Sequence, residues 1–179
     1  MKSVILLAGF PILVYVVLCV ALYFDQRSLI YYPQRGVSVA GARFLRLPTP
    51  QVAVMGRSLG SGVAVWLASQ RPVSQLILVT PFNSLQEIAA AQFPYFPVRW
   101  LLLDRYESWR FAPAVKVPTL TLEAEKDEVI PAASTQALAG HFRPGLVTLK
   151  ILSDARHNTI SDHPEYVELL REFGESINQ

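Results

Sequence analysis

The sequence predicts an α/β fold, with a mostly parallel sheet covered by helices on both faces and one apolar helix before it. Three observations carry this prediction. From residue 52 onward, short apolar runs of strand length alternate with helix-like stretches. The first run ends in a Gly-x-Ser-x-Gly turn at residues 56–60, directly before a helix-like stretch. Residues 4–24 contain no charged side chain, and a helix of that length spans roughly 30 Å, the thickness of a bilayer core.

Length and composition narrow the classes of function. The 179 residues suit one domain plus an appendage. The formal charge is +2 and basic residues are scattered among acidic ones, so the chain lacks the basic patch of a nucleic-acid-binding protein. The single cysteine, Cys19, rules out a disulfide within the chain and a cysteine-based metal site. We expect no metal, no cofactor and no nucleic-acid partner.

Residues 1–27 are predicted to form a membrane anchor. A cleavable signal peptide is the alternative, but its apolar core is usually shorter and ends in an Ala-x-Ala-like site. Here the apolar run continues through Val20–Phe24 without such a site, which favours an uncleaved, single-pass anchor. Lys2 flanks the run on one side, and Arg27 and Arg35 flank it on the other. The positive-inside rule therefore leans weakly toward a cytoplasmic C-terminal domain.

The rest of the chain divides into a linker, residues 28–50, and a domain, residues 51–179. Within the linker, residues 42–47 alternate apolar and charged side chains, as a half-buried strand does. In the domain, continuous apolar runs predict strands, and Pro72, Pro81 and Pro118 mark where elements end or begin. The predicted strands are 52–55, 76–80, 119–122 and 147–152. The predicted helices are 63–69, 84–92, 132–142 and 163–177, the last with apolar residues at helical spacing.

The Gly-x-Ser-x-Gly turn has the layout of a nucleophile elbow, in which a serine sits on a sharp strand-to-helix turn. Its strained backbone needs neighbours without bulk, and Gly56 and Gly60 meet that need. The turn lifts the Ser58 hydroxyl above the sheet edge and directs the Leu59 amide at an oxyanion formed there. Two other glycine motifs fit less well. No lysine follows as a P-loop requires, and Val65 stands where a dinucleotide fingerprint needs its third glycine.

Partners for Ser58 are expected just after other strands, because ligands of open α/β sheets bind beyond the carboxyl ends of the strands. Asp127 follows the third predicted strand and His157 follows the last. In these positions His157 would take the proton of Ser58 and return it to the leaving group, and Asp127 would orient His157. Glu125 and Glu128 remain alternatives to Asp127 as the acid.

Three other polar residues fit less well. His141 lies near the end of a predicted helix, and His163 stands beside Pro164 at the start of another, a capping position. Asp154 is more typical of a turn residue. The chain order Ser58, Asp127, His157 is that of the catalytic triad in α/β hydrolases.

Several motifs together resemble the Bem46-like α/β hydrolases, a family close to the protein depalmitoylases. They are Gly56–Gly62, Pro81-Phe82-Asn83-Ser84-Leu85, Asp127–Pro131, His157-Asn158, and Leu29–Pro33 after the anchor. The resemblance covers most of the chain and implies a membrane-anchored serine hydrolase acting on acyl esters or thioesters. Asn83 replaces an aspartate that is common in the family, at a position we expect to be structural.

The resemblance also exposes a gap. The family has several strands and a helix between anchor and elbow, including a His-Gly loop that supplies the second oxyanion amide. Here about 27 residues separate Phe24 from Gln51, and there is no His-Gly dipeptide. The sequence therefore predicts a truncated α/β-hydrolase fold and an impaired enzyme. It also predicts an open edge on the elbow strand, unless the predicted strand at residues 42–47 pairs with it. The alternative is a non-catalytic remnant that acts as an anchored interaction module.

Aromatic residues crowd the segment after the second predicted strand, residues 93–109. In this architecture such a segment can cap the active site. One hypothesis is that it lines an acyl-binding groove, with Phe82 and Trp100 as substrate-binding residues. The other is that the aromatic side chains simply pack on the sheet.

Overall fold

The computed structural model describes residues 2–31 and 52–175 of the chain. They form two compact units, one made of Met1–Leu45 with Ala89–Asp104 and the other of Arg46–Ile88 with Arg105–Gln179. The strand predicted at residues 42–47 lies outside the described residues.

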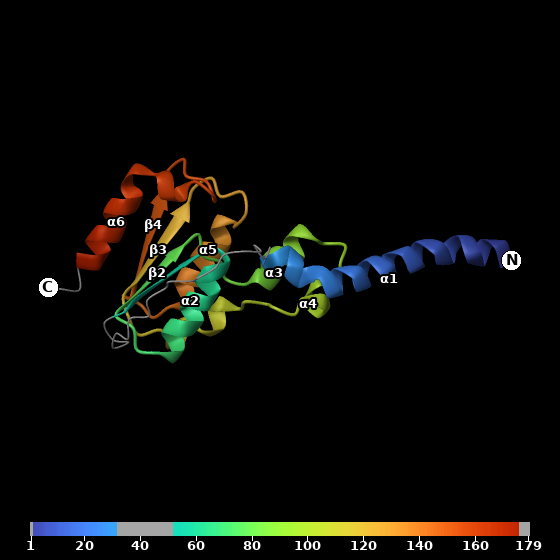
Figure 1. Cartoon of the computed structure of the whole chain (residues 1–179), viewed down its shortest axis with the longest axis horizontal. Helices are drawn as coiled ribbons and strands as arrows, with labels where there is room; N and C mark the ends of the chain where they lie inside the picture. Colours follow the sequence, from blue (N-terminus) through green and yellow to red (C-terminus); the bar gives the residue numbers. More distant parts are fainter. Residues whose placement is uncertain (1, 32–51, 176–179) are drawn as a thin grey trace, which may run out of the picture. The chain divides into compact units, whose positions relative to one another are not determined.

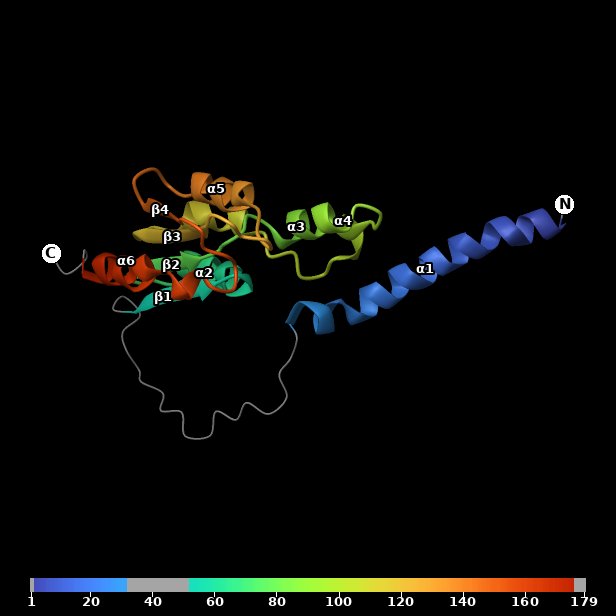
Figure 2. The ribbon, with the colours of Figure 1, turned by 90° about the horizontal axis from the view of Figure 1, so that it is seen from above.

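The second unit holds a sheet of four strands, β1 (Ala53–Arg57), β2 (Gln75–Val79), β3 (Thr119–Ala124) and β4 (Val147–Leu152). All neighbours pair in parallel, in the order β1-β2-β3-β4 (Figure 2). The predicted parallel sheet is confirmed. Because the strands run the same way, their carboxyl ends meet at one edge, where the loops after β1, β3 and β4 converge.

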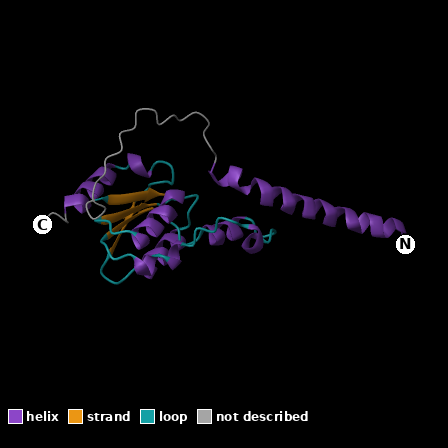
Figure 3. Ribbon diagram, turned by 60° about the horizontal axis from the view of Figure 1, so that its bottom comes forward, coloured by secondary structure: helices purple, strands orange, loops and turns teal. Residues whose placement is uncertain are grey.

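Helices cover both faces of this sheet (Figure 1, Figure 3). They are α2 (Leu59–Gln70), α5 (Ala132–His141) and α6 (Pro164–Glu175), whereas α3 (Leu85–Gln92) follows β2 and has no buried residue. Short 3₁₀ turns occur at Ser108–Arg110, Ala112–Ala114 and Ile160–Asp162. Helices α3, α5 and α6 begin and end within two residues of their predicted ranges, whereas α2 begins at Leu59, four residues before the predicted start.

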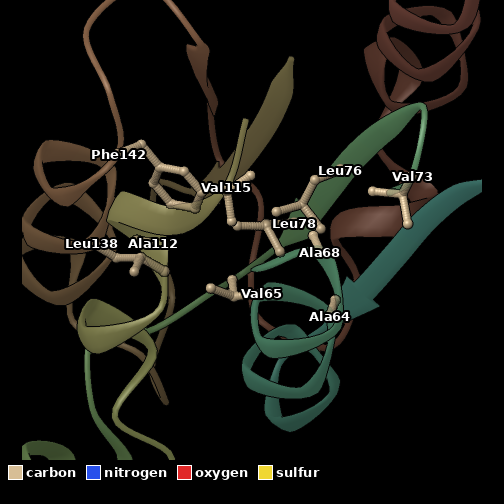
Figure 4. Close-up of a cluster of buried hydrophobic side chains, with 10 residues drawn as sticks. All are labelled: Ala64, Val65, Ala68, Val73, Leu76, Leu78, Ala112, Val115, Leu138 and Phe142. Carbon is tan, nitrogen blue, oxygen red and sulfur yellow. The ribbon is translucent and has the colours of Figure 1, made fainter. Parts of the chain in front are cut away.

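Strand β2 shows how the two faces are filled, since its side chains alternate between them. Leu76 and Leu78 belong to a buried cluster with residues of α2 and α5, drawn in Figure 4. Ile77 and Val79 belong to a second buried cluster, against which apolar residues of α6 pack. All five residues of β2 are buried, which explains why this strand is a continuous apolar run in the sequence.

Strand β1 ends the described sheet and pairs there with β2 alone. Met55 on this strand is about half exposed, at 47%. Within the described residues, this arrangement leaves the elbow strand with an apolar outer edge, the kind of edge that favours association.

The first unit contains α1 (Lys2–Tyr31) and α4 (Val98–Leu101). Helix α1 includes a 23-residue stretch, Gly9–Tyr31, that is long and apolar enough to cross a membrane. The helix continues past residue 27 through Tyr31, so the first residues predicted as linker are helical. Pro11 lies inside it, and membrane helices tolerate an internal proline.

Candidate active site

The turn between β1 and α2 holds Ser58 in a strained conformation. Its φ is +48° and its ψ is −122°, which costs on the order of 1–3 kcal/mol for a residue with a side chain. Backbone contacts impose it. The Ser58 amide donates to the carbonyl of Val79 at 2.9 Å. The amide and the hydroxyl of Ser61 both donate to the carbonyl of Ser58, at 2.9 Å and 2.6 Å.

Gly56 is required by the close crossing of β1 and α2. A Cβ atom at this position would lie 2.4 Å from the carbonyl oxygen of Gly60 and 2.6 Å from the Cβ of Ala64. The steric prediction for Gly60 is wrong, since a Cβ there would meet no atom within 4 Å. Of these two glycines, only Gly56, at the end of β1, lies close against helix α2.

Three side chains from separate loops form a connected chain of hydrogen bonds. The Nε2 atom of His157 lies 2.9 Å from the Ser58 hydroxyl oxygen. Its Nδ1 atom lies 2.9 Å and 3.0 Å from the two carboxylate oxygens of Asp127. The side chains of His157 and Asp127 are only 8% and 4% exposed, so water competes little for these contacts. The structure therefore brings the three predicted residues together, with the imidazole between the hydroxyl and the carboxylate.

The loop after β3 fixes the direction of the acid. The Oδ1 atom of Asp127 accepts hydrogen bonds from the amides of Val129 and Ile130, at 2.8 Å and 2.7 Å. These contacts occupy one side of the carboxylate and direct it at His157. The neighbouring Glu128 contacts the backbone of the histidine loop and not the imidazole ring, accepting the amide of His157 at 3.3 Å.

Arg57 is a residue of the site that reasoning from the sequence missed. Its guanidinium donates to the carbonyls of His157 and Asn158, at 2.8 Å and 3.0 Å. It thereby ties the histidine loop to the elbow strand. Its place just before the nucleophile, at the carboxyl end of β1, was the only signal in the sequence.

The alternative histidines have other partners. The ring of His141 lies against that of Trp109, with centroids 6.1 Å apart. The Nδ1 atom of His163 accepts the amide of Glu165 at 3.2 Å, in the first turn of α6. His163 is thus the capping residue that its sequence position predicted.

The alternative acids are also engaged elsewhere. Glu125 accepts the amide of Asp154 at 2.8 Å. Asp154 has a φ of +61°, as expected of a turn residue, and pairs with Lys126. The Lys126 ammonium holds the pKa of Asp154 below its usual value. Of these acidic residues, only Asp127 contacts the ring of His157.

A buried carboxyl group, that of Glu123, lies at the end of β3. This residue is 3% exposed, and its oxygens accept the amide of Gln136 at 3.2 Å and 3.4 Å. Burial raises the pKa of Glu123, and the negative charge of Asp127 adds to the rise, whereas the Gln136 hydrogen bond opposes it. The environment of Asp127 therefore includes a second carboxyl that resists ionisation.

The remaining predicted site residues have different surroundings. Leu59 is the first residue of α2, where backbone amides have no partner within the helix. Phe82, after β2, is fully buried at 1% exposure. Trp100 is 85% exposed and belongs to the other compact unit. Among the described residues, no group of three or more His, Cys, Asp or Glu side chains is placed to hold a metal ion.

Proteins of several organisms are similar to more than half of this chain. An uncharacterized protein of Mycobacterium tuberculosis is 36% identical in an alignment of 120 positions that covers 59% of this chain and 43% of that protein. The alpha/beta hydrolase domain-containing protein aho-3 of Caenorhabditis elegans is 30% identical, over 71% of this chain and 37% of its own. Protein bem46 of Schizosaccharomyces pombe is 27% identical, over 69% of this chain and 43% of its own. No family model matches the sequence.

Solved structures share the fold at low identity. The 2,6-dihydroxy-pseudo-oxynicotine hydrolase superposes with a TM-score of 0.58 at 18% identity, covering 73% of this chain and 41% of that one. The esterase domain of a Rhodothermus marinus protein gives a TM-score of 0.54 at 16% identity, covering 68% of this chain and 60% of that one. By sequence, the homologues of this chain include protein bem46 and the alpha/beta hydrolase domain-containing protein aho-3, and the chain spans about two-fifths of the length of the curated relatives it matches.

Proposed function

We propose that this α/β-hydrolase homologue is a membrane-anchored serine hydrolase that cleaves acyl esters or thioesters. The single observation that carries the proposal is the unbroken contact chain from the Ser58 hydroxyl through the His157 ring to the Asp127 carboxylate. The strained backbone of Ser58 supports it, because strain of this kind concentrates at functional sites.

The proposed reaction follows from the three contacts. His157 removes the hydroxyl proton through Nε2 as the Ser58 oxygen attacks the acyl carbonyl. The leaving alcohol or thiol then takes that proton from His157, which leaves an acyl group on Ser58. Water, deprotonated by His157, attacks the acyl carbon and releases the acid and free Ser58. Asp127 stabilises the imidazolium in both halves.

The oxyanion of the intermediates needs preorganised donors, and Leu59 at the start of α2 would supply one amide. The sequence lacks the His-Gly loop that supplies a second donor in the family it resembles. Losing one such donor costs on the order of 3 kcal/mol, roughly a hundredfold or more in rate. We therefore expect turnover at least about a hundredfold below that of a relative with the loop.

Membrane attachment is the second part of the proposal. Helix α1 contains the apolar stretch Gly9–Tyr31, and many of its large apolar side chains, Phe10 and Phe24 among them, are exposed. A soluble chain would bury such a surface, whereas a bilayer accepts it. A single-pass anchor with the hydrolase domain on the cytoplasmic side accords with the distribution of flanking charge.

Labelling of the full chain with a fluorophosphonate probe tests the proposed nucleophile. The wild-type chain should be labelled and the Ser58→Ala variant should not. Ser69→Ala is the matched control, because Ser69 lies on the same helix and its hydroxyl contacts only residues of that region, donating to the carbonyl of Trp66 and accepting from the side-chain amide of Gln70. Equal labelling of wild type and Ser58→Ala would refute the assignment of Ser58.

The alternative function, a non-catalytic anchored interaction module, is favoured by one observation, the absence of a His-Gly loop. One measurement separates the two functions. A properly folded wild-type chain that takes up no probe, under conditions in which a relative with the loop is labelled, would support the interaction module.

A further inference from the structure

The segment Ala89–Asp104, called the excursion below, leaves the sheet unit within α3, and the chain returns to that unit before the turn at Ser108. Its base is closed by backbone contacts between its two ends. Ser84 and Glu107 form an antiparallel bridge. The amides of Leu85 and Gln86 donate to the carbonyls of Tyr106 and Arg105, at 3.4 Å and 3.2 Å. The residues in between, Ala89–Asp104, belong to the unit of α1.

The near end of this excursion is fastened to the C-terminal part of α1 by polar contacts. Gln26, which is buried at 8% exposure, donates to the carbonyl of Leu101 at 3.1 Å and accepts the amide of Leu103 at 2.9 Å. Arg27 forms a two-point ion pair with Asp104, at 2.9 Å and 3.1 Å. The Tyr31 hydroxyl donates to the same carboxylate at 3.0 Å.

The far end is fastened about three turns further along α1. The Tyr15 hydroxyl donates to the carbonyl of Tyr95 at 2.9 Å. The rings of Tyr15 and Phe96 stack, with centroids 5.9 Å apart. Between Tyr15 and Arg27 a helix rises about 18 Å. The excursion therefore follows the apolar stretch of α1 over about half the thickness of a bilayer core.

Residues 93–103 have the surface that a lipid environment requires. Phe93, Tyr95, Trp100 and Leu103 are exposed by 52%, 86%, 85% and 49%. Arg99 is the only charged residue in this stretch, and a long arginine side chain can reach the headgroups while its stem stays in apolar surroundings. Trp and Tyr are the residues enriched at membrane interfaces.

The backbone of this stretch is also prepared for an apolar environment, in which unpaired polar groups are costly. Pro94 and Pro97 have no amide hydrogen. The amides of residues 93, 96, 98, 100, 101 and 102 donate to carbonyls within the excursion. The amide of Leu103 and the carbonyls of Tyr95 and Leu101 are paired with side chains of α1.

We propose that residues 93–103 form a second membrane-contacting element, inserted in the bilayer beside the C-terminal half of α1. The partner is the lipid itself, with the aromatic side chains of Tyr95 and Trp100 against acyl chains and the Arg27–Asp104 pair at headgroup level. The argument for lipid is continuity, because the excursion is bonded to α1 within the stretch Gly9–Tyr31. This inference depends on the membrane anchor of the proposed function, and it is independent of the proposed chemistry.

Tryptophan fluorescence of the full chain in phosphatidylcholine vesicles tests the insertion. Trp66→Phe with Trp109→Phe leaves Trp100 as the sole tryptophan, whereas Trp100→Phe with Trp109→Phe leaves Trp66, which is 48% exposed on α2. Lipids brominated on their acyl chains quench only tryptophans that contact them. We expect bromination to lower Trp100 emission about twofold or more and to leave Trp66 emission unchanged. Gln26→Leu, which removes the contacts to Leu101 and Leu103, should abolish the Trp100 quenching.

Resistance of the vesicle-bound chain to alkaline extraction separates the insertion of residues 93–103 from the membrane anchoring by α1. A chain that resists extraction, but whose Trp100 is not quenched, would overturn the insertion and leave the anchor intact. A chain that is extracted would overturn both. Equal quenching of Trp100 and Trp66 would also overturn the proposal, since contact would not be specific to the excursion. If the tryptophan variants fail to fold, an environment-sensitive label on Tyr95→Cys in a Cys19→Ser background gives the same readout.

Discussion

Replacing Gly56 by alanine should damage the elbow more than any comparable change on α2. The new Cβ would lie 2.4 Å from the carbonyl oxygen of Gly60, whereas ordinary contacts begin near 3.4 Å. Relief requires β1 and α2 to separate by about 1 Å, and overpacking of this kind costs up to about 3 kcal/mol. A gain of about 0.5–1 kcal/mol from lower backbone entropy offsets part of that cost.

The net loss of about 2 kcal/mol corresponds to a fall in Tm of roughly 4–8 °C for a chain of this size. The same movement displaces Ser58 from His157, and a misplacement of about 1 Å costs on the order of a hundredfold in rate. Thermal unfolding of the full chain in detergent micelles measures the first effect, and the rate of fluorophosphonate labelling measures the second.

Gly60→Ala is the matched control, because it adds the same methyl group four residues away, where no atom lies within 4 Å. Gly60 lies within helix α2, so alanine should raise stability by about 0.5–1 kcal/mol and leave labelling unchanged. A Gly56→Ala variant with the Tm and labelling rate of the wild type would refute the close-crossing argument. So would a Gly60→Ala variant as damaged as Gly56→Ala.

Two further changes test the surroundings of the site. Arg57→Leu removes two charge-assisted hydrogen bonds to the loop of His157. Stability should therefore fall by about 2 kcal/mol, and labelling should slow about tenfold or more. Arg71→Leu, at an exposed arginine after α2, is the control, and equal effects of the two variants would contradict a positioning role for Arg57. Burial raises the pKa of Glu123, so the folded chain keeps the carboxyl proton of this residue to higher pH than the unfolded chain does. The stability that the protonated Glu123 contributes is therefore full below the ordinary glutamate pKa and is lost as pH rises through the raised pKa. Glu123→Gln should therefore reduce the loss of stability as pH rises above the ordinary glutamate pKa, measured by denaturant titration, and an unchanged pH dependence would contradict the assignment.

The order and type of the elements follow from the amino-acid sequence alone. Buried parallel strands are continuous apolar runs because both of their faces are covered, and β2 with its five buried residues is the clearest case. The elbow, and the loops expected to hold its partners, follow from the same pattern. In a parallel sheet the carboxyl ends of all strands lie at one edge, so the pattern of strands is enough to expect Ser58, Asp127 and His157 close together.

Which polar residues meet depends on the tertiary packing. Glu125, Asp127 and Glu128 lie within four residues of one another, and spacing alone does not separate them. The amides of Val129 and Ile130 orient Asp127 at His157, while Glu125 is occupied by the amide of Asp154. Directions of this kind depend on loop dihedrals, which no local pattern encodes.

Contacts between segments that are distant along the chain could not be predicted from the sequence either. Arg57 donates to the carbonyls of His157 and Asn158, which lie 100 and 101 positions further along the chain. Gln26 and Arg27 hold the excursion at Leu101–Asp104, about 75 positions away. Periodicity and turn residues report on neighbours along the chain and on which face is apolar. Pairing of polar groups at such separations is set by the packed geometry, because only there does burial make an unpaired donor or acceptor costly.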